Sequence, residues 1–306
     1  MLLIFSWNLI FSQQNTLSRS LKKYNLSSGS YDGSGLKNPT EVFKKTISFP
    51  EASWIRIKFR SVNLGKNSYI VIEAVEDSSK QILNSSEIEQ WNYTSAYFNG
   101  DSLMISLFAG PGDQNTFFII DELFIGKTVS QTLSKGSSTP NGILDVCGSD
   151  DRVLSNDKAV GRIITEPSGT YGTGFILFNG RIATAGHVLE PAISESELSI
   201  IEFNVPTSGP DGSIKHADAI DQYTFKRSYI IDKHTNGEGD DWAIFYTNTN
   251  NGLGAKERQN CFFYVEQNNS FQTIQVTGYG QANGNYNHAQ KTSSGQNQNS
   301  SDKYIC

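Results

Sequence analysis

The segment Gly172–Val188 constrains the fold of this chain more than any other part of the sequence. It holds two short apolar runs, Phe175–Phe178 and Arg181–Thr184, which are rich in β-branched and aromatic residues. The dipeptide Asn179-Gly180 between them is the strongest short-range signal for a two-residue hairpin turn. The sequence therefore predicts a β-hairpin at this point.

Small residues follow the second run and lead into a histidine. Thr184, Ala185 and Gly186 let the backbone bend tightly, so we expect His187 at the rim of a packed sheet. An imidazole in that place can act as a general base toward a neighbouring nucleophile. The structural alternative is a histidine that ends a strand and bonds a neighbouring carbonyl.

An aspartate further along the chain can orient this imidazole. Asp241 stands at the head of the short apolar run Asp241–Tyr246. A general-base histidine needs a carboxylate on its Nδ1 side, which fixes the tautomer and stabilises the imidazolium. We assign that role to Asp241 and expect its neighbour Asp240 to be solvated. The alternative is that Asp241 is a turn residue before a strand.

A third element, Ile274–Gly280, predicts a strand that closes on a Gly-aromatic-Gly turn. Together, Thr-Ala-Gly-His, Asp-Trp-Ala-Ile and Val-Thr-Gly-Tyr-Gly resemble, in sequence and in order, the trypsin-like peptidases of the chymotrypsin fold. Gly-Thr-Gly-Phe before the histidine strand resembles their secreted bacterial branch, which includes glutamyl endopeptidases. The likeness covers Cys147 to Cys306. It implies a double β-barrel in which His187 is the general base and Asp241 its orienting acid.

The nucleophile motif of that family is missing from the sequence. Family members carry the serine in a Gly-Asn/Asp-Ser-Gly turn, whose backbone N–H groups also form the oxyanion hole. Here a polar segment, 281–295, follows, and we interpret it as a surface loop whose Ser294-Gly295 pair is not the nucleophile. Lys303–Cys306 resembles the start of the strand that precedes the nucleophile turn. We therefore expect a chain truncated before the nucleophile, an incomplete second barrel and the serine beyond Cys306.

Composition and the N-terminus both indicate an exported all-β protein. The 306 residues include 27 glycines and only 18% charged residues, and helical patterning is scarce. Residues 1–14 are apolar, too short for a mature membrane span, and typical of a signal peptide; a buried strand is the alternative. We predict a secreted protein without stable membrane association. The net charge of −6 and the dispersed lysines and arginines argue against a nucleic-acid partner.

The cysteines and the other histidines do not form a metal-binding pattern. Three cysteines are an odd number, and their disulfide connectivity is left open by the sequence. A metal centre needs tighter clustering of cysteine and histidine, so we predict neither a metal nor a cofactor. The remaining histidines are interpreted as surface residues in polar loops. The residues concerned are Cys147, Cys261, Cys306, His216, His234 and His288.

Residues 15–126 predict a separate accessory or pro-domain with the pattern of a β-sandwich. The block resembles the jelly-roll or CUB-like domains that accompany secreted bacterial peptidases. Trp54, Trp91 and Tyr97 are either core residues or a platform for a carbohydrate or protein ligand. The expected strands are Val42–Phe49, Trp54–Phe59, Tyr69–Ala74, Ser102–Phe108 and Thr116–Asp121.

Residues 127–146 are rich in serine, glycine and proline and are interpreted as an exposed linker whose cleavage would free the peptidase domain, 147–306. Two functional classes remain. The first is a secreted serine endopeptidase that hydrolyses protein or peptide substrates through a Ser-His-Asp triad. The second is a catalytically inactive protease-like binding protein, because the 306-residue chain lacks the nucleophile.

Overall fold

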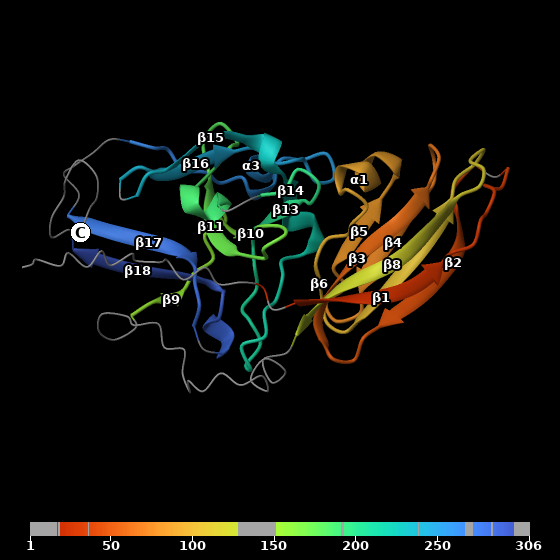
Figure 1. Ribbon diagram of the computed structural model, residues 1–306, viewed down its shortest axis with the longest axis horizontal. Helices are drawn as coiled ribbons and strands as arrows, with labels where there is room; N and C mark the ends of the chain where they lie inside the picture. The colour runs from red at the N-terminus through yellow and green to blue at the C-terminus, as the bar shows by residue number, and fades with distance from the viewer. Residues whose placement is uncertain are drawn as a thin grey trace, which may run out of the picture.

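The computed structural model describes residues 17, 19–35, 37–127, 151–190, 193–237, 239–266, 272–282 and 284–296. Regular structure in these ranges is almost all β, which confirms the predicted all-β class (Figure 1). No helix within the same ranges is long and apolar enough to cross a membrane. The predicted signal peptide, residues 128–146 of the linker, Cys147 and Lys303–Cys306 lie outside the described residues.

The N-terminal part forms two four-stranded antiparallel sheets packed face to face, as the sequence pattern predicted. One sheet has the order β1–β8–β3–β6 and the other β2–β7–β4–β5. Helix α1 (Ser85–Gln90) connects β5 to β6. The strands are β1 (Arg19–Ser27), β2 (Thr40–Ser48), β3 (Ala52–Asn63), β4 (Tyr69–Ala74), β5 (Lys80–Leu83), β6 (Phe98–Asn99), β7 (Ser102–Ala109) and β8 (Phe117–Lys127).

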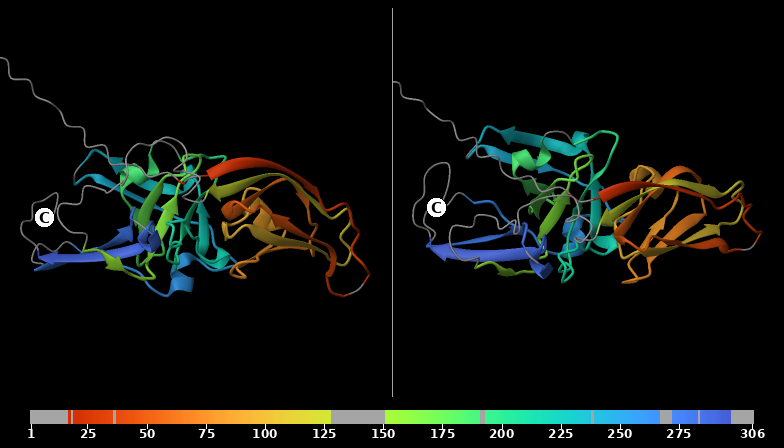
Figure 2. Two further views of the ribbon diagram at one scale, coloured as in Figure 1. Left: turned by 90° about the horizontal axis from the view of Figure 1, so that it is seen from below. Right: turned by 60° about the horizontal axis from the view of Figure 1, so that its bottom comes forward.

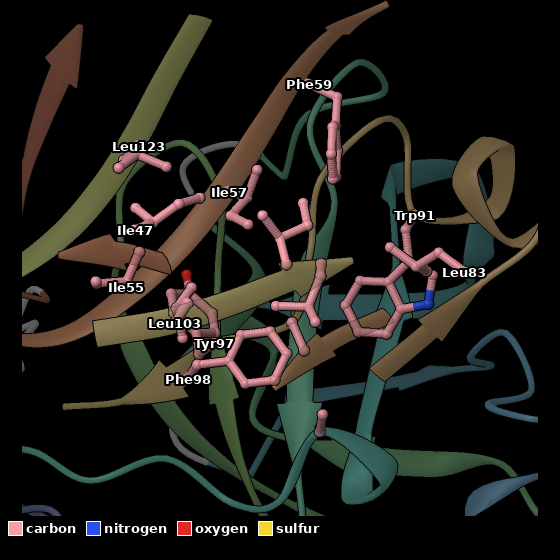
Figure 3. Close-up of a cluster of buried hydrophobic side chains, with 14 of the residues drawn as sticks. Ile47, Ile55, Ile57, Phe59, Leu83, Trp91, Tyr97, Phe98, Leu103 and Leu123 are labelled. Atoms are coloured by element: carbon pink, nitrogen blue, oxygen red, sulfur yellow. The ribbon is translucent and has the colours of Figure 1, made fainter. Parts of the chain in front are cut away.

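The alternating apolar residues of both sheets fill the space between them. Figure 3 shows this core, which includes Ile47, Ile55, Ile57, Leu103 and Leu123. Trp54, Trp91 and Tyr97 belong to the same cluster and are at most 2% exposed. These three aromatic side chains are therefore core residues, and they do not form a surface platform for a ligand.

The part after residue 150 contains a seven-stranded antiparallel sheet of order β14–β13–β10–β11–β12–β16–β15. The sheet curls on itself. This is seen from Phe225 and Phe245, whose rings lie 4.3 Å apart although their strands are far apart in the strand order of the sheet. Its strands are β10 (Val160–Ile164), β11 (Tyr171–Ile176), β12 (Ile182–Thr184), β13 (Ser199–Glu202), β14 (Gln222–Phe225), β15 (Ile230–Thr235) and β16 (Asp241–Phe245). Short helices flank them: η1 (Gly186–Leu189), η2 (Ala219–Asp221), η3 (Arg227–Tyr229) and α3 (Ala255–Gln259).

A three-stranded sheet of order β17–β18–β9 lies on the side away from the sandwich (Figure 2). It consists of β9 (Val153–Leu154), β17 (Thr273–Tyr279) and β18 (Gln290–Gln296), with η4 (Gly284–Tyr286) in the β17–β18 connection. The predicted strand 274–280 is thus present as β17. The prediction of a loop over 281–295 is wrong for its last residues, because Ser294 lies in β18 and pairs with Gln275 of β17. Cross-strand pairing makes a strand of this polar sequence.

Candidate active site

The predicted hairpin is present and leads directly to the histidine. β11 pairs with β12 from Gly174–Thr184 to Ile176–Ile182. Gly180 in the connecting turn has a φ of +79°, a conformation that glycine adopts without steric cost. After β12 the chain enters η1, whose second residue is His187.

Strand β16 lies beside β12 and brings Asp241 to this histidine. Thr184 lies opposite Ala243 in the antiparallel pair, and the same register continued by two residues places Gly186 opposite Asp241. The backbones approach closely at this point. A Cβ on Gly186 would lie only 1.8 Å from the carbonyl oxygen of His234 on β15, so the packing requires glycine here.

Both carboxylate oxygens of Asp241 bind the same histidine. Oδ2 lies 2.5 Å from Nδ1 of His187, and Oδ1 accepts a hydrogen bond of 2.8 Å from the backbone N–H of His187. Two bonds from one carboxylate fix the orientation of the imidazole and favour the tautomer with its proton on Nδ1. The side chains are 44% and 26% exposed, so a molecule in solution can reach the pair.

The hairpin β15–β16 adds a second histidine and a second aspartate beside the pair. Nδ1 of His234 lies 2.9 Å from Oδ1 of Asp240, and its ring stacks on Trp242 with centroids 4.4 Å apart. Asn236 donates to Asp240, and this bond together with His234 lowers the pKa of the Asp240 carboxyl. Asp240 is 45% exposed, so it is solvated as expected. His234 lies on strand β15, so the prediction that it lies in a loop is wrong.

The other two histidines were wrongly predicted to lie at the surface. His216 is fully buried and His288 is 5% exposed. Nδ1 of His216 lies 3.2 Å from Glu202, which in turn pairs with the buried Arg162 at 2.7 Å. Burial lowers the pKa of both imidazoles, that of His288 to about 3 with further help from Arg162. The residues that contact them, Glu202 and Arg162, lie on other strands, so the sequence around each histidine did not reveal its burial.

The arrangement at His187 can perform general acid–base chemistry. With Nδ1 bonded to Asp241, the neutral ring carries its lone pair on Nε2, where it can accept a proton from an attacking hydroxyl. The carboxylate then stabilises the imidazolium. Among the residues that the structure describes, no three His, Cys, Asp or Glu side chains gather into a metal-binding group. Cys261 is half-buried and has no disulfide partner among them.

No protein-family model matches this sequence, and no curated protein matches it either. Among solved structures, the chain is similar to the protease Anisep from Arthrobacter nicotinovorans. The two share 17% sequence identity with a TM-score of 0.36, over 49% of this chain and 68% of that chain. A distant structural neighbour of this chain is therefore a protease.

Proposed function

We propose that this chain is a secreted serine endopeptidase, with His187 as the general base and Asp241 as its orienting acid. One observation carries the proposal. Both carboxylate oxygens of Asp241 hydrogen-bond to His187, one to Nδ1 of the ring and one to the backbone N–H. This is the arrangement that a Ser-His-Asp triad requires of its acid and base. The apolar start of the sequence, typical of a signal peptide, supports export.

The proposed nucleophile is a serine beyond Cys306, because no Gly-Asn/Asp-Ser-Gly motif occurs in the 306 residues. Its hydroxyl oxygen attacks the peptide carbonyl carbon while Nε2 of His187 takes the hydroxyl proton. The imidazolium returns that proton to the departing amine, which leaves an acyl-enzyme. Water, deprotonated by the same Nε2, then hydrolyses the ester and restores the serine.

The second candidate is a catalytically inactive, protease-like binding protein. The observation in its favour is the place of Ser294, which pairs with Gln275 inside the regular β17–β18 ladder. A residue in such a ladder does not form the tight turn that presents a nucleophile with its oxyanion hole. The serine of this segment is therefore not a candidate, and activity depends on a nucleophile from elsewhere.

A fluorophosphonate probe, which reacts with activated serines, tests the proposal on the chain extended by the sequence that the proposal places after Cys306. We expect covalent labelling. His187→Ala and Asp241→Asn should each slow labelling by about 10²- to 10⁴-fold, because the serine loses its base or the base loses its orientation. Asp240→Asn is the matched control and should leave the labelling rate nearly unchanged, since Asp240 bonds Asn236 and His234.

Two results would count against the endopeptidase. An extended product that stays unlabelled would favour the binding protein, and labelling that is unaffected by His187→Ala would remove His187 from the mechanism. Labelling of the 306-residue chain itself would place the nucleophile inside it and contradict the expected position beyond Cys306. Mass spectrometry of the labelled peptide identifies the serine in either case.

A further inference from the structure

The hydrophobic core of the sandwich (residues 19–127) extends into the protease-like body (residues 151–296), which also has a second buried cluster of its own. Trp54, Tyr97 and Phe98 of the sandwich lie in the same buried cluster as Ile164, Tyr171 and Ile200 of the body. All six are at most 9% exposed. Figure 1 shows the β6 end of the sandwich against the strands of the curled sheet. Separation of the two parts would expose these side chains to water on both sides.

Two side-chain amides join the backbones of the two parts in a reciprocal way. Gln222 of the body accepts from the N–H of Tyr97 at 2.9 Å and donates to its carbonyl at 2.8 Å. Asn99 of the sandwich does the same for His216, with distances of 2.7 and 2.9 Å. Each amide thus satisfies the two backbone groups that a neighbouring strand would otherwise bond. If the parts separated, these backbone groups would have to exchange their amide partners for water.

A buried carboxylate of the body holds three side chains of the sandwich. Oε1 of Glu166 accepts from Arg19 at 2.5 Å, from Arg56 at 3.3 Å and from the hydroxyl of Tyr97 at 3.0 Å. The side chains of Arg56 and Glu166 are only 3% and 6% exposed. A buried ion pair of this kind contributes little net stability as a whole, but the loss of one partner leaves an uncompensated charge.

An aromatic stack links this contact to the interior of the body. The ring of His216 lies parallel to that of Tyr97, with centroids 4.3 Å apart, and edge-on to that of Trp54 at 5.2 Å. Nδ1 of the same ring lies 3.2 Å from Glu202 of the body. Apolar, amide, ionic and aromatic contacts therefore all cross between sandwich and body in a buried region. Surfaces of proteins that separate readily are more polar and less completely buried.

We infer that the sandwich is a permanent structural part of the molecule and stays bound to the body after the chain between them is cut. Cleavage of the linker is then not an activation step that frees the body. The surface of the body that takes part in these contacts is covered by the β6 end of the sandwich of the same chain. This inference does not depend on the proposed peptidase activity.

The test uses the full chain with a cleavage site for a specific protease built into the segment from Ser134 to Thr139. After complete cutting, verified by denaturing electrophoresis, the two fragments should elute together from a size-exclusion column at the volume of the uncut protein. Elution as two separate peaks, or precipitation of either fragment on cutting, would overturn the inference. The uncut variant, with a thermal transition like that of the parent chain, is the control for folding.

A matched pair of substitutions shows whether the buried contact is responsible. The cut complex is immobilised through a tag on the sandwich, and release of the body is followed over time. Glu166→Gln should raise the release rate by about 100-fold or more. Glu73→Gln removes a carboxylate from the partly exposed Lys80–Glu73 pair on the same sandwich and should change the rate by less than about fivefold. Equal release rates for the two variants would contradict the role of Glu166.

Discussion

The geometry of the candidate site depends on one glycine as much as on its two functional side chains. Gly186 lets η1 approach β15 and β16 closely enough for Asp241 to bond both the ring and the backbone of His187. A Cβ there would lie 1.8 Å from the carbonyl oxygen of His234. Since that oxygen belongs to backbone, it cannot rotate away, and the strand itself would have to move.

Gly186→Ala should therefore displace the histidine from its aspartate. We expect a loss of about 1–3 kcal/mol in the free energy of unfolding, measured by urea titration. The low-field proton resonance of His187 Nδ1, visible by NMR when a carboxylate accepts that proton, should also shift or vanish. Gly35→Ala is the control, because a Cβ on Gly35 meets nothing within 4 Å. An unchanged resonance in the Gly186 variant would contradict this account.

At the residue level, the sequence revealed what is local and concealed what is not. His187 follows directly from a hairpin signal, and Asp241 begins a recognisable apolar strand, so both could be singled out and the structure brings them together. His216 and His288 stand in polar segments and looked exposed. Their burial arises from contacts with residues such as Glu202 and Arg162, which other strands supply.

The connection between β17 and β18 is held by a buried lysine. Lys291 is 3% exposed, and its Nζ donates to the carbonyls of Gly280, Tyr286 and Ala289 at 2.7, 2.6 and 3.1 Å. One cation thus gathers three backbone acceptors of the connection that contains η4. Hydrogen bonds from a charged donor are stronger than neutral ones, so this side chain holds Gly280, Tyr286 and Ala289 close together.

Lys291→Met keeps the length of the side chain but removes its donors, which leaves those carbonyls without their shared partner. We expect the free energy of unfolding to fall by about 1–3 kcal/mol. Amide hydrogen exchange should become faster in the segment 284–289, since its local opening becomes easier. Lys80→Met, in the 49% exposed lysine of a surface pair, should leave exchange in that segment unchanged. Equal exchange in both variants would show that Lys291 does not order the connection.

At the level of elements, strands with alternating apolar residues were predicted well, whereas polar strands were missed. β4 was expected at Tyr69–Ala74 and is found there, and β2, β3, β7 and β8 each overlap an expected range. β18 was missed because its residues, Gln290–Gln296, are polar and partly exposed. Seven cross-strand pairs with β17 determine its structure, and such pairing is invisible in a single segment.

Across the whole molecule, two buried histidines link stability to pH. Burial holds the pKa of His216 and His288 below the ordinary value of about 6.5, that of His288 at about 3. Below about pH 6.5 the unfolded chain binds protons that the folded chain does not, so stability is greatest above this pH and falls as the pH falls. Carboxylates such as Glu202, whose pKa is lowered by Arg162 and His216 against the effect of burial, add to this loss only below about pH 4.5.

Removal of one histidine should reduce this dependence. His288→Asn is suitable, because His288 has a φ of +48° and asparagine tolerates that conformation. Between about pH 6 and pH 5, the free energy of unfolding of the variant should fall less steeply than that of the parent chain by about 1.2 kcal/mol per pH unit. Urea titrations at a series of pH values measure both slopes. Parallel slopes would mean that His288 is protonated in the folded protein.

The arrangement of the two parts was only half accessible to prediction. A β-sandwich followed by a protease-like sheet could be expected from strand patterns and motifs, and the structure has both sheets of the sandwich and the curled sheet. Their shared core could not be expected, because the residues that make it are apolar or amide side chains with no local signature. Aromatic residues such as Trp54 and Tyr97 indicate a buried core. They do not indicate that His216 of the other part packs against them.

Tyr97 and Gln222, which are in contact, are 125 residues apart in the sequence. This separation determines how long after Tyr97 the ribosome makes Gln222. At about 5–20 residues per second, the ribosome makes Gln222 roughly 6–25 s after Tyr97. For that interval the nascent sandwich has an uncovered aromatic edge. The growing chain, rather than the finished protein, is therefore the species in which this surface is most prone to aggregate.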